Sequence, residues 1–453
     1  MLTNRYLLML SLLLSGCSLT TPLPGSAVVA PAHWSQVPEL TRWPERRWWQ
    51  QYESPALDTL LARAEAGNLD LAAAASRLLQ AEAQLRQARA TLLPQAEAGL
   101  DLGRSGNDSG ASASYGATLT ARYQLDFWGR NQALADSARA SLLASDFDAQ
   151  TLALSIQASV VSNWLQILEN QQRLALARDS LANAERVLQL VDTRYRFGAA
   201  DSLQVSQQKT LVAQLRASLP GLEQQALQLR NSLILLLGET PDARLPAFTP
   251  LQAISLPTIG AGLPAELLDR RPDIRASEAR LVAANANITA ARAALFPSIA
   301  LTGQLGARST ALGSLLGDPT TVWSLAAGLT QSIFDGGALR AQVALSEARQ
   351  QELLVEYRRT VLGALADTDT ALGAVQQAEQ RYAFLEQAND EARRAFDLAE
   401  IRYRAGAIDL QALLDTQRTW YQSQDALAQQ RAAWLLASVD LFRALGGGWQ
   451  APQ

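Results

Sequence analysis

The sequence contains a single cysteine, Cys17, and a single histidine, His33. The chain therefore lacks the set of cysteine and histidine residues that a zinc site, a catalytic Cys–His pair or a Ser–His–Asp triad would need. His33 lies in a proline-rich stretch far from any group of acids, so we interpret it as a surface residue. There is also one lysine, Lys209, and no basic patch interleaved with aromatic residues. We expect neither an enzyme nor a nucleic-acid-binding protein, and no metal or other cofactor.

Aromatic residues are also few, at 6% of the chain, and the net charge of −4 is slight for 453 residues. Alanine, leucine, glutamine and arginine dominate the long middle segments, which is the composition of long helices and coiled coils. The length would suffice for two or three ordinary domains. The sequence therefore predicts a mainly helical protein.

The N-terminal residues 1–16 have the layout of a secretory signal, with an apolar run, Tyr6–Leu14, followed by small residues. The run is too short for a good membrane-spanning helix. Leu14-Ser15-Gly16-Cys17 resembles the bacterial lipobox, in which the cysteine thiol is lipidated. The alternative is a buried cysteine near an ordinary cleavage site. We expect Cys17 to be the lipidation site, and Ser18 after it favours the outer membrane.

Four stretches alternate between apolar and polar residues with a period of two, as half-buried strands do. They form two hairpins, at about 95–127 and about 298–334, and we interpret the polar segment 104–113 as the flexible loop of the first. Strands of about ten residues cross a bilayer when tilted. A soluble edge hairpin would alternate too, but the recurrence favours membrane strands. Small residues on the polar faces favour a water-filled bore: Gly99, Gly103, Ser114, Gly116, Thr118, Ser298 and Gly328.

Long helices follow each hairpin. From Gly129 to Phe197 a helical pattern continues for about 67 residues, on the order of 100 Å. A second helix, roughly Ser202–Leu237, follows a turn at Gly198, and Pro220 within it predicts a kink.

The second half of the chain repeats the first. RYRFGAADSL (194–203) matches RYRAGAIDLQ (402–411), which lies 208 residues later, and Ala90–Pro94 matches Ala293–Pro297. The predicted segments are a signal peptide (1–16), a lipidated extended segment (17–54), a first repeat (55–238), a linker (239–264), a second repeat (265–447) and a C-terminal tail (448–453).

Four strands cannot close a barrel, because about eight are the smallest number that fills its own interior. Other copies must therefore pair the sheet edges: a dimer would supply eight strands and a trimer twelve. In each repeat the two shorter helices together match the long helix, which gives four helical columns per chain. Twelve columns about 10 Å apart would form a ring about 38 Å across, wide enough for an open channel, whereas eight would leave a much narrower one.

The lipobox, WWQQYESPALDTLLARAEAGNLDL (48–71), the hairpin junctions and the two RYR motifs together resemble the outer membrane factor family, the TolC-like efflux channels. The resemblance is to the lipidated branch found with resistance-nodulation-division pumps, and it covers the chain from Cys17 to Gly447. It implies a homotrimer with a 12-stranded β-barrel in the outer membrane of a Gram-negative bacterium and an α-barrel of twelve helical columns in the periplasm.

The function that the resemblance implies is a passive exit duct for small molecules such as drugs. An inner-membrane pump would drive export through a periplasmic adaptor (membrane fusion) protein. The alternative, from a different class, is a lipid-anchored trimeric coiled-coil scaffold or adhesin. Such a stalk would not need two amphipathic hairpins with polar inner faces.

The resemblance also assigns residues to the two helical turns, which would form a periplasmic mouth that meets the adaptor. The matching residues are Arg194, Tyr195, Gly198 and Asp201 in the first repeat and Arg402, Tyr403, Gly406 and Asp409 in the second. We favour plain helix capping over gating for the two aspartates that follow the turns. The acidic gate of the family matches Asp415, with Arg418 and Gln411 one turn to either side. The alternative is an ordinary surface pair between Asp415 and Arg418.

Overall fold

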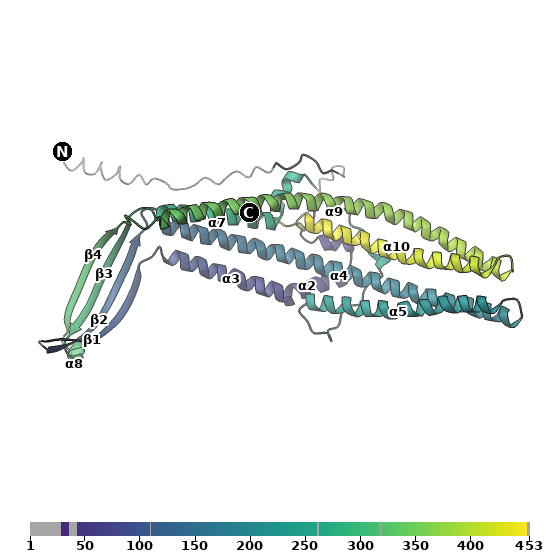
Figure 1. Ribbon diagram of the computed structural model, residues 1–453, viewed down its shortest axis with the longest axis horizontal. Coiled ribbons are helices and arrows are strands. Elements are labelled where there is room, and N and C mark those ends of the chain that lie inside the picture. The colour runs from purple at the N-terminus through teal and green to yellow at the C-terminus, as the bar shows by residue number, and fades with distance from the viewer. Residues whose placement is uncertain (1–28, 36–42, 109, 261, 318, 451–453) are drawn as a thin grey trace. The chain divides into compact units, whose positions relative to one another are not determined.

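The computed structural model describes residues 29–35, 43–108, 110–260, 262–317 and 319–450. Cys17, with the predicted signal peptide and lipid anchor, lies outside these residues. The described elements, shown in Figure 1, are η1 (Trp48–Tyr52), α2 (Pro55–Gly67), α3 (Leu69–Ala90), β1 (Gln95–Asn107), β2 (Gly110–Leu125), α4 (Arg130–Arg196), α5 (Ser202–Leu236), η2 (Leu251–Ala253), η3 (Pro264–Glu266), α6 (Leu267–Arg270), α7 (Pro272–Ala293), β3 (Ser298–Ser309), α8 (Leu312–Gly317), β4 (Thr320–Thr330), α9 (Ala338–Arg404) and α10 (Leu410–Ala444).

The two halves of the chain fold alike. α3 and α7 are both 22 residues long, α4 and α9 are both 67, and α5 and α10 are both 35. Each half places a pair of strands between its 22-residue and its 67-residue helix. The prediction of two structural repeats is therefore confirmed. α5 continues as one helix through Pro220, where the sequence predicts a kink.

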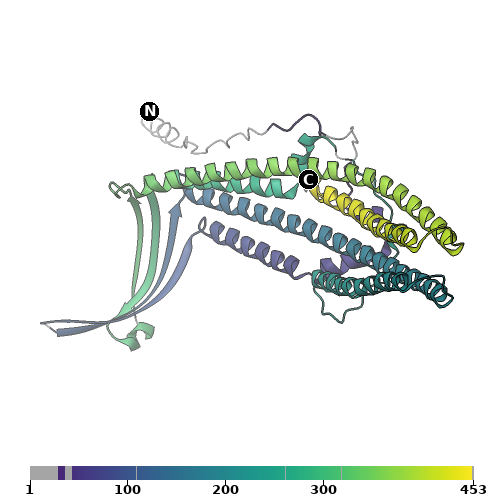
Figure 2. The same ribbon diagram turned by 45° about the vertical axis from the view of Figure 1, so that its right-hand side comes forward.

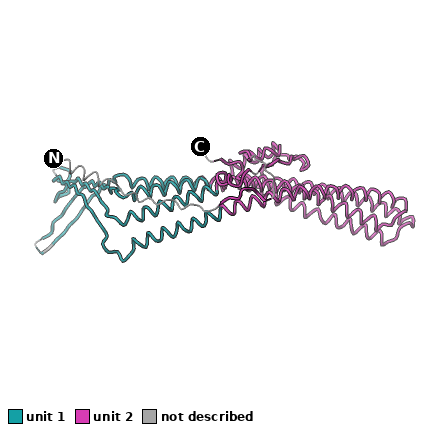
Figure 3. Tube along the Cα trace, turned by 90° about the horizontal axis from the view of Figure 1, so that it is seen from above, with its two compact units in different colours: residues 1–28, 76–148, 273–360 teal, residues 29–75, 149–272, 361–453 magenta. Residues whose placement is uncertain are grey.

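The chain divides into two compact units whose boundary falls inside the helices (Figure 3). Unit 1 includes residues 76–148 and 273–360, which contain the four strands and the helical segments next to them. Unit 2 includes residues 29–75, 149–272 and 361–453, which contain α5, α10 and the linker between the repeats.

In unit 1 the strands form one antiparallel sheet in the order β1-β2-β3-β4, as Figures 1 and 2 show. The register puts residues of one kind in the same row across the sheet. One row is apolar and largely exposed: Ala98, Leu119, Leu305 and Trp323. The next row, whose side chains point to the other face, is polar: Glu97, Thr120, Gln304 and Ser324. No described strand pairs with the outer edge of β1 or of β4, so the sheet has one apolar face, one polar face and two open edges.

The predicted flexible loop at 104–113 is wrong. β1 and β2 stay paired from Arg104 and Ala113 as far as Asn107 and Gly110. Gly110 has a φ of +131°, a conformation that glycine adopts without strain, so the chain reverses there within a tight turn. The glycine- and serine-rich composition marks strands with small side chains rather than an unpaired loop. In the second hairpin, a short helix, α8, lies between β3 and β4.

The helical segments of unit 1 follow the same order as the strands. Asn131 of α4 donates to the carbonyl of Thr91, just after α3, at 3.3 Å. Arg280 of α7 forms an ion pair with Asp148 of α4. α7 in turn pairs with α9 through Arg292 and Glu347, whose charged atoms lie 2.7 Å apart. The order α3, α4, α7, α9 therefore leaves α3 and α9 as the outer helices of this unit.

In unit 2, α5 runs back along α4 and α10 runs back along α9 (Figures 1 and 2). The two pairs meet where Arg173 of α4 binds Asp425 of α10. The short helices join end to end. The buried Asn68, between α2 and α3, accepts from the amides of Asp70 and Leu71 at 2.9 and 3.0 Å, and its own amide donates to the carbonyl of Leu236 in α5 at 2.8 Å. This contact lies within unit 2 and holds the start of α3 beside the end of α5.

The main core of unit 2 lies around the large side chains that follow the proline-rich N-terminal stretch. Trp48 stacks on Phe442 with ring centres 4.7 Å apart. Tyr52 is fully buried, and its hydroxyl lies 2.7 Å from the Ser438 hydroxyl. Burial raises the pKa of Tyr52, so this phenol stays neutral. The core thus joins the N-terminal segment to the end of α10.

Candidate functional site

Two helical turns end the long helices α4 and α9 in unit 2, and both close in the same way. Gly198 and Gly406 each have a φ of +74°, which glycine adopts without strain. The Ala199 amide donates to the Arg194 carbonyl at 2.8 Å, and the second turn repeats this bond at 2.9 Å. This Schellman arrangement satisfies the last carbonyls of each long helix and lets the return helix begin within a few residues.

Asp201 and Asp409 cap the return helices α5 and α10. The Asp201 carboxylate accepts from the Gln204 amide at 2.9 Å, and the Asp409 carboxylate accepts from the Ala412 amide at 2.9 Å. A negative charge at this position also interacts favourably with the helix dipole. The capping interpretation of these two aspartates accounts for both contacts.

The first turn is linked to the second by Arg194. Its Nη1 donates to the Tyr403 carbonyl at 2.5 Å, and its Cζ lies 4.7 Å from the centre of the Tyr403 ring. Tyr403 is 2% exposed, and its hydroxyl has no hydrogen-bond partner among the described residues. Burial raises the pKa of Tyr403, against the lowering effect of the Arg194 charge. Two residues that the resemblance assigns to separate turns are therefore in direct contact.

The equivalent residues of the other repeat make no such contact within the chain. Tyr195, the counterpart of Tyr403, is 49% exposed. Arg402, the counterpart of Arg194, is exposed, and within the described residues its side chain forms no hydrogen bond or ion pair. One chain thus contains one Arg–Tyr contact and the two unmatched halves of a second.

Asp415 lies on an exposed face of α10, about one and a half turns after its start. Its carboxylate accepts a hydrogen bond from the Gln411 side chain at 3.0 Å. Arg418 is also exposed, and it forms no ion pair with Asp415. The alternative of an ordinary Asp415–Arg418 surface pair is therefore not what forms. Asp415 and Gln411 are close together, and the carboxylate has no arginine partner among the described residues.

A compact apolar cluster of residues from α4, α5, α9 and α10 packs next to the two turns. Phe396 of α9 stacks on Trp420 of α10 with ring centres 4.9 Å apart and an interplanar angle of 19°. Val191 of α4 and Leu413 of α10 are fully buried in the same cluster. Nearby, Gln417 donates to the Tyr421 hydroxyl at 2.8 Å, and burial raises the pKa of Tyr421 to about 12. The turns thus rest on a packed layer that contains side chains of both repeats.

One polar contact between the repeats was not predicted. Arg173 of α4 binds both carboxylate oxygens of Asp425 in α10, at 2.6 and 3.2 Å. Glu169 lies 3.6 Å from the same guanidinium, and its pKa is raised by burial, lowered by Arg173 and raised further by Asp425. A salt bridge between residues 252 positions apart leaves no periodic signal in the sequence, so only the packing of α4 on α10 reveals it.

An antiparallel sheet with one apolar face, one polar face and two open edges, whose hairpins are each followed in the chain by a 67-residue helix, defines the protomer of an outer-membrane channel. The comparisons name the family. The model of the family described as "Outer membrane efflux protein" matches residues 60–239 and 263–447. The pyoverdine export outer membrane protein OpmQ of Pseudomonas aeruginosa is 42% identical over 99% of this chain and 97% of that protein.

More distant relatives agree. The antibiotic efflux pump outer membrane protein ArpC of Pseudomonas putida is 33% identical over 96% of this chain and 94% of that protein. Among solved structures, the open state of the Neisseria gonorrhoeae MtrE outer membrane channel matches with a TM-score of 0.86 and 30% identity, over 96% of this chain and 99% of that one. The chain belongs to the outer membrane efflux protein family.

The family fixes the general function. The chain is the outer-membrane channel component of an efflux system, located in the outer membrane of a Gram-negative bacterium with a periplasmic extension. The predicted fold class is confirmed: the chain has the fold of the trimeric channels, with a membrane β-barrel and a helical barrel built from internal repeats. The alternative of a coiled-coil scaffold or adhesin is set aside.

Proposed function

We propose that the chain is a passive exit duct and performs no catalytic step. An inner-membrane pump would supply the energy, and a periplasmic adaptor protein would connect the two. The observation that carries the proposal is the sheet of unit 1, whose apolar face suits lipid and whose polar face suits a water-filled bore. Purified protein should conduct ions in a planar lipid bilayer without any added energy source. A complete lack of conductance, even after mutations that open the mouth, would contradict the proposal.

The protomers would close the channel as a homotrimer. The outer edges of β1 and β4 lack partners within the described chain, and the edge of one copy would pair with the edge of the next. In unit 2 the outer helices are α5 and α9. Both carry exposed apolar side chains that a neighbouring copy would cover: Leu203, Leu227 and Leu235 on α5, and Phe384, Leu398 and Ile401 on α9.

The gate would be controlled by Arg–Tyr contacts around the mouth. Within one chain Arg194 holds Tyr403. Arg402 lies on the outer helix α9, next to the place that α4 and α5 of the next copy would take, and Tyr195 is exposed on α4. Repeat symmetry would pair Arg402 with Tyr195 of that copy, so that six similar contacts surround the mouth of a trimer. Opening would then require contacts within and between protomers to break.

Asp415, with Gln411 beside it and Arg418 one turn on, would form the charged constriction. Three unpaired carboxylates near a threefold axis repel one another and attract cations. The channel should therefore prefer cations over anions, and Asp415→Asn should reduce that preference. Reversal potentials measured in a potassium chloride gradient test this: an unchanged cation preference in Asp415→Asn would exclude Asp415 from the constriction.

Cys17 would carry the lipid that anchors the chain to the outer-membrane lipid. Palmitate labelling of the full-length protein should be lost in Cys17→Ser, and labelling that persists would refute the assignment.

The exposed turns around Gly198 and Gly406 would meet the adaptor. Cysteines placed beside these glycines should crosslink to an adaptor protein in cells, whereas a cysteine placed midway along α4 should not.

The cargo of the relatives suggests a first compound to test. OpmQ proteins of two Pseudomonas species, at 42% and 43% identity, are named for pyoverdine export. We propose that this chain exports a siderophore of the same kind. Expression in a Pseudomonas aeruginosa strain that lacks OpmQ should restore secreted pyoverdine fluorescence. This requires that the duct transports the compound and assembles with the pump of that strain. Restored secretion in a non-conducting variant would show that the assay does not report on this duct.

A further inference from the structure

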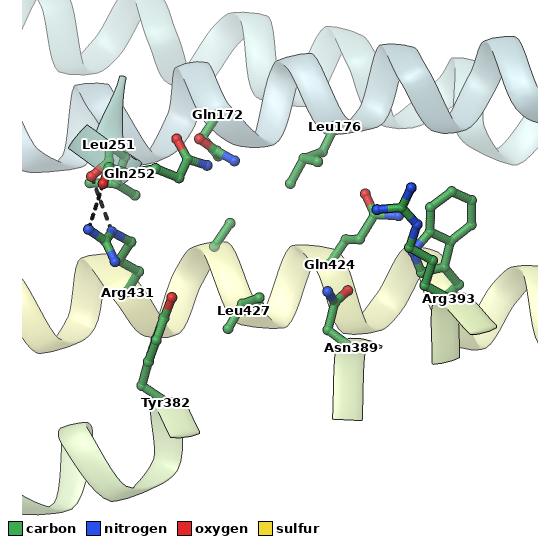
Figure 4. Close-up of a pocket in the computed structure, with 12 residues that line it drawn as sticks. Gln172, Leu176, Leu251, Gln252, Tyr382, Asn389, Arg393, Gln424, Leu427 and Arg431 are labelled. Carbon is green, nitrogen blue, oxygen red and sulfur yellow. Dashed lines mark hydrogen bonds between the residues drawn. The ribbon is translucent and has the colours of Figure 1, made fainter. Parts of the chain in front are cut away.

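A cavity of about 250 Å³ lies within unit 2, and none of the turn residues lines it (Figure 4). Its walls come from α4, η2, α9 and α10, so both repeats and the linker contribute. The twelve lining residues are Gln172, Leu176, Leu251, Gln252, Tyr382, Asn389, Arg393, Trp420, Gln424, Leu427, Ala428 and Arg431.

The charges in this cavity are all of one sign. Arg393 and Arg431 lie towards its two ends in Figure 4, and none of the twelve described lining residues is Asp or Glu. Arg431 donates to the backbone carbonyls of Leu251, Gln252 and Ile254 at 3.2, 2.8 and 3.1 Å, so its partners there are neutral. Arg393 has no hydrogen bond or ion pair among the described residues. Arg393 is exposed and Arg431 is half-buried, so the cavity is open to solvent at Arg393, and both arginines lack a carboxylate partner among the described residues.

The remaining walls suit a flat molecule with hydrogen-bonding groups at its edge. Trp420 and Tyr382 provide aromatic surface, and the stacking of Trp420 on Phe396 holds its ring in place. Leu427 of α10 lines the same space, and the side-chain amides of Gln172 and Gln424 project from opposite helices (Figure 4). Asn389 accepts from the Ser423 hydroxyl at 3.2 Å, which leaves its NH2 group to donate.

We infer that this cavity binds a small aromatic carboxylate. The carboxylate would bind Arg393, because a planar guanidinium binds a carboxylate through two parallel hydrogen bonds. The ring would lie against Trp420 and Leu427. The volume is just below the range of ~300–1,000 Å³ that is usual for drug-sized ligands, so the cavity suits a molecule of one or two rings. Nothing in the exit-duct proposal requires this site, and the two can fail independently.

The test uses the full-length detergent-solubilised protein and isothermal titration calorimetry with 2-naphthoate. The comparison probes are 2-naphthamide, which keeps the ring but has no negative charge, and inorganic phosphate, which is negatively charged but has no ring. The variant is Arg393→Gln. Its matched control is Arg394→Gln: Arg394 is the adjacent residue, it pairs with Glu391 at 2.7 Å, and it does not line the cavity. Both variants carry the same detergent, so uptake of the probe by the micelle cancels between them.

The expected result is one 2-naphthoate site per chain, with affinity about tenfold weaker in Arg393→Gln and unchanged in Arg394→Gln, as loss of a charge-assisted hydrogen bond predicts. 2-Naphthamide and phosphate should each bind at least about tenfold more weakly than 2-naphthoate. Equal affinity in the two variants, or no binding at all, would overturn the site. Equal binding of 2-naphthamide would overturn the role of the charge, and equal binding of phosphate would overturn the role of the ring.

Discussion

Loss of the Arg194–Tyr403 contact should open the mouth of the channel. A hydrogen bond from a charged donor contributes about 1.5–3 kcal/mol, and an exposed cation–π contact about 0.5–1 kcal/mol. Arg194 is partly exposed, so we take about 2 kcal/mol per protomer, near the lower end. If the three protomers open together, Arg194→Gln removes about 6 kcal/mol of closing free energy. That would move a 1:99 open-to-closed equilibrium past 99:1, since this change needs about 5.5 kcal/mol.

Single-channel recording in planar bilayers measures this effect directly. Arg194→Gln should spend most of its time in a high-conductance state that is rare in the wild-type protein. Arg196→Gln is the matched control, because Arg196 lies two residues further on, is exposed and forms no hydrogen bond, ion pair or ring contact among the described residues. Tyr403→Phe should behave like wild type, since Arg194 binds the backbone carbonyl and the ring, and the hydroxyl has no partner. Equal open probability in Arg194→Gln and Arg196→Gln would refute the gating role.

Three further predictions follow from local contacts. Asp409→Ala should cost about 1 kcal/mol of helix stability and speed amide hydrogen exchange at Ala412, while Asp201→Ala does the same at Gln204; unchanged exchange would contradict the capping contacts. Asn68→Ala should cost about 2–4 kcal/mol because it removes three hydrogen bonds of a buried side chain, and Asn68→Asp, which keeps the two accepted bonds, should cost less; thermal melts that rank the two equally would argue against the α3–α5 junction. The raised pKa of Glu169 means that its stability contribution is full below its ordinary value of 4.5 and is lost as the pH rises through the raised pKa. Glu169→Gln should therefore gain melting temperature relative to wild type as the pH rises from 4 to 7, and a constant difference would show that Glu169 does not titrate in this range.

Features with a regular repeat in the sequence could be predicted, and contacts between distant residues could not. The continuous helical pattern from Gly129 to Phe197 predicted α4 to within a residue of its ends, because the conformation of each residue in a helix depends on its near neighbours. The alternation in 114–125 predicted the faces of β2. The loop at 104–113 was wrong because small polar residues occur both in loops and on the water-facing side of a strand, and only the pairing with β1 distinguishes them.

The candidate site shows the same division. Asp201, Asp409 and the two turn glycines could be located from their positions next to the helices, since a cap acts over three or four residues. The contact between Arg194 and Tyr403 joins residues 209 positions apart and uses a backbone carbonyl, which any residue type would offer. Arg431 likewise binds three carbonyls of the linker. No sequence pattern marks such acceptors, so these contacts emerge only from the packed structure.

The matched helix lengths limit how the periplasmic reach of this channel can evolve. One extra heptad in α4 alone would carry Gly198 about 10 Å past Gly406 and take Arg194 away from Tyr403. The return helix would need the same insertion to get back to Asn68, and the second repeat would need both changes again. A longer duct therefore requires four coordinated insertions in one gene, whereas a change in length of the β1–β2 hairpin needs no matching change in the second repeat. Evolution should find it easier to change what the outer surface presents than how far the channel extends towards its pump.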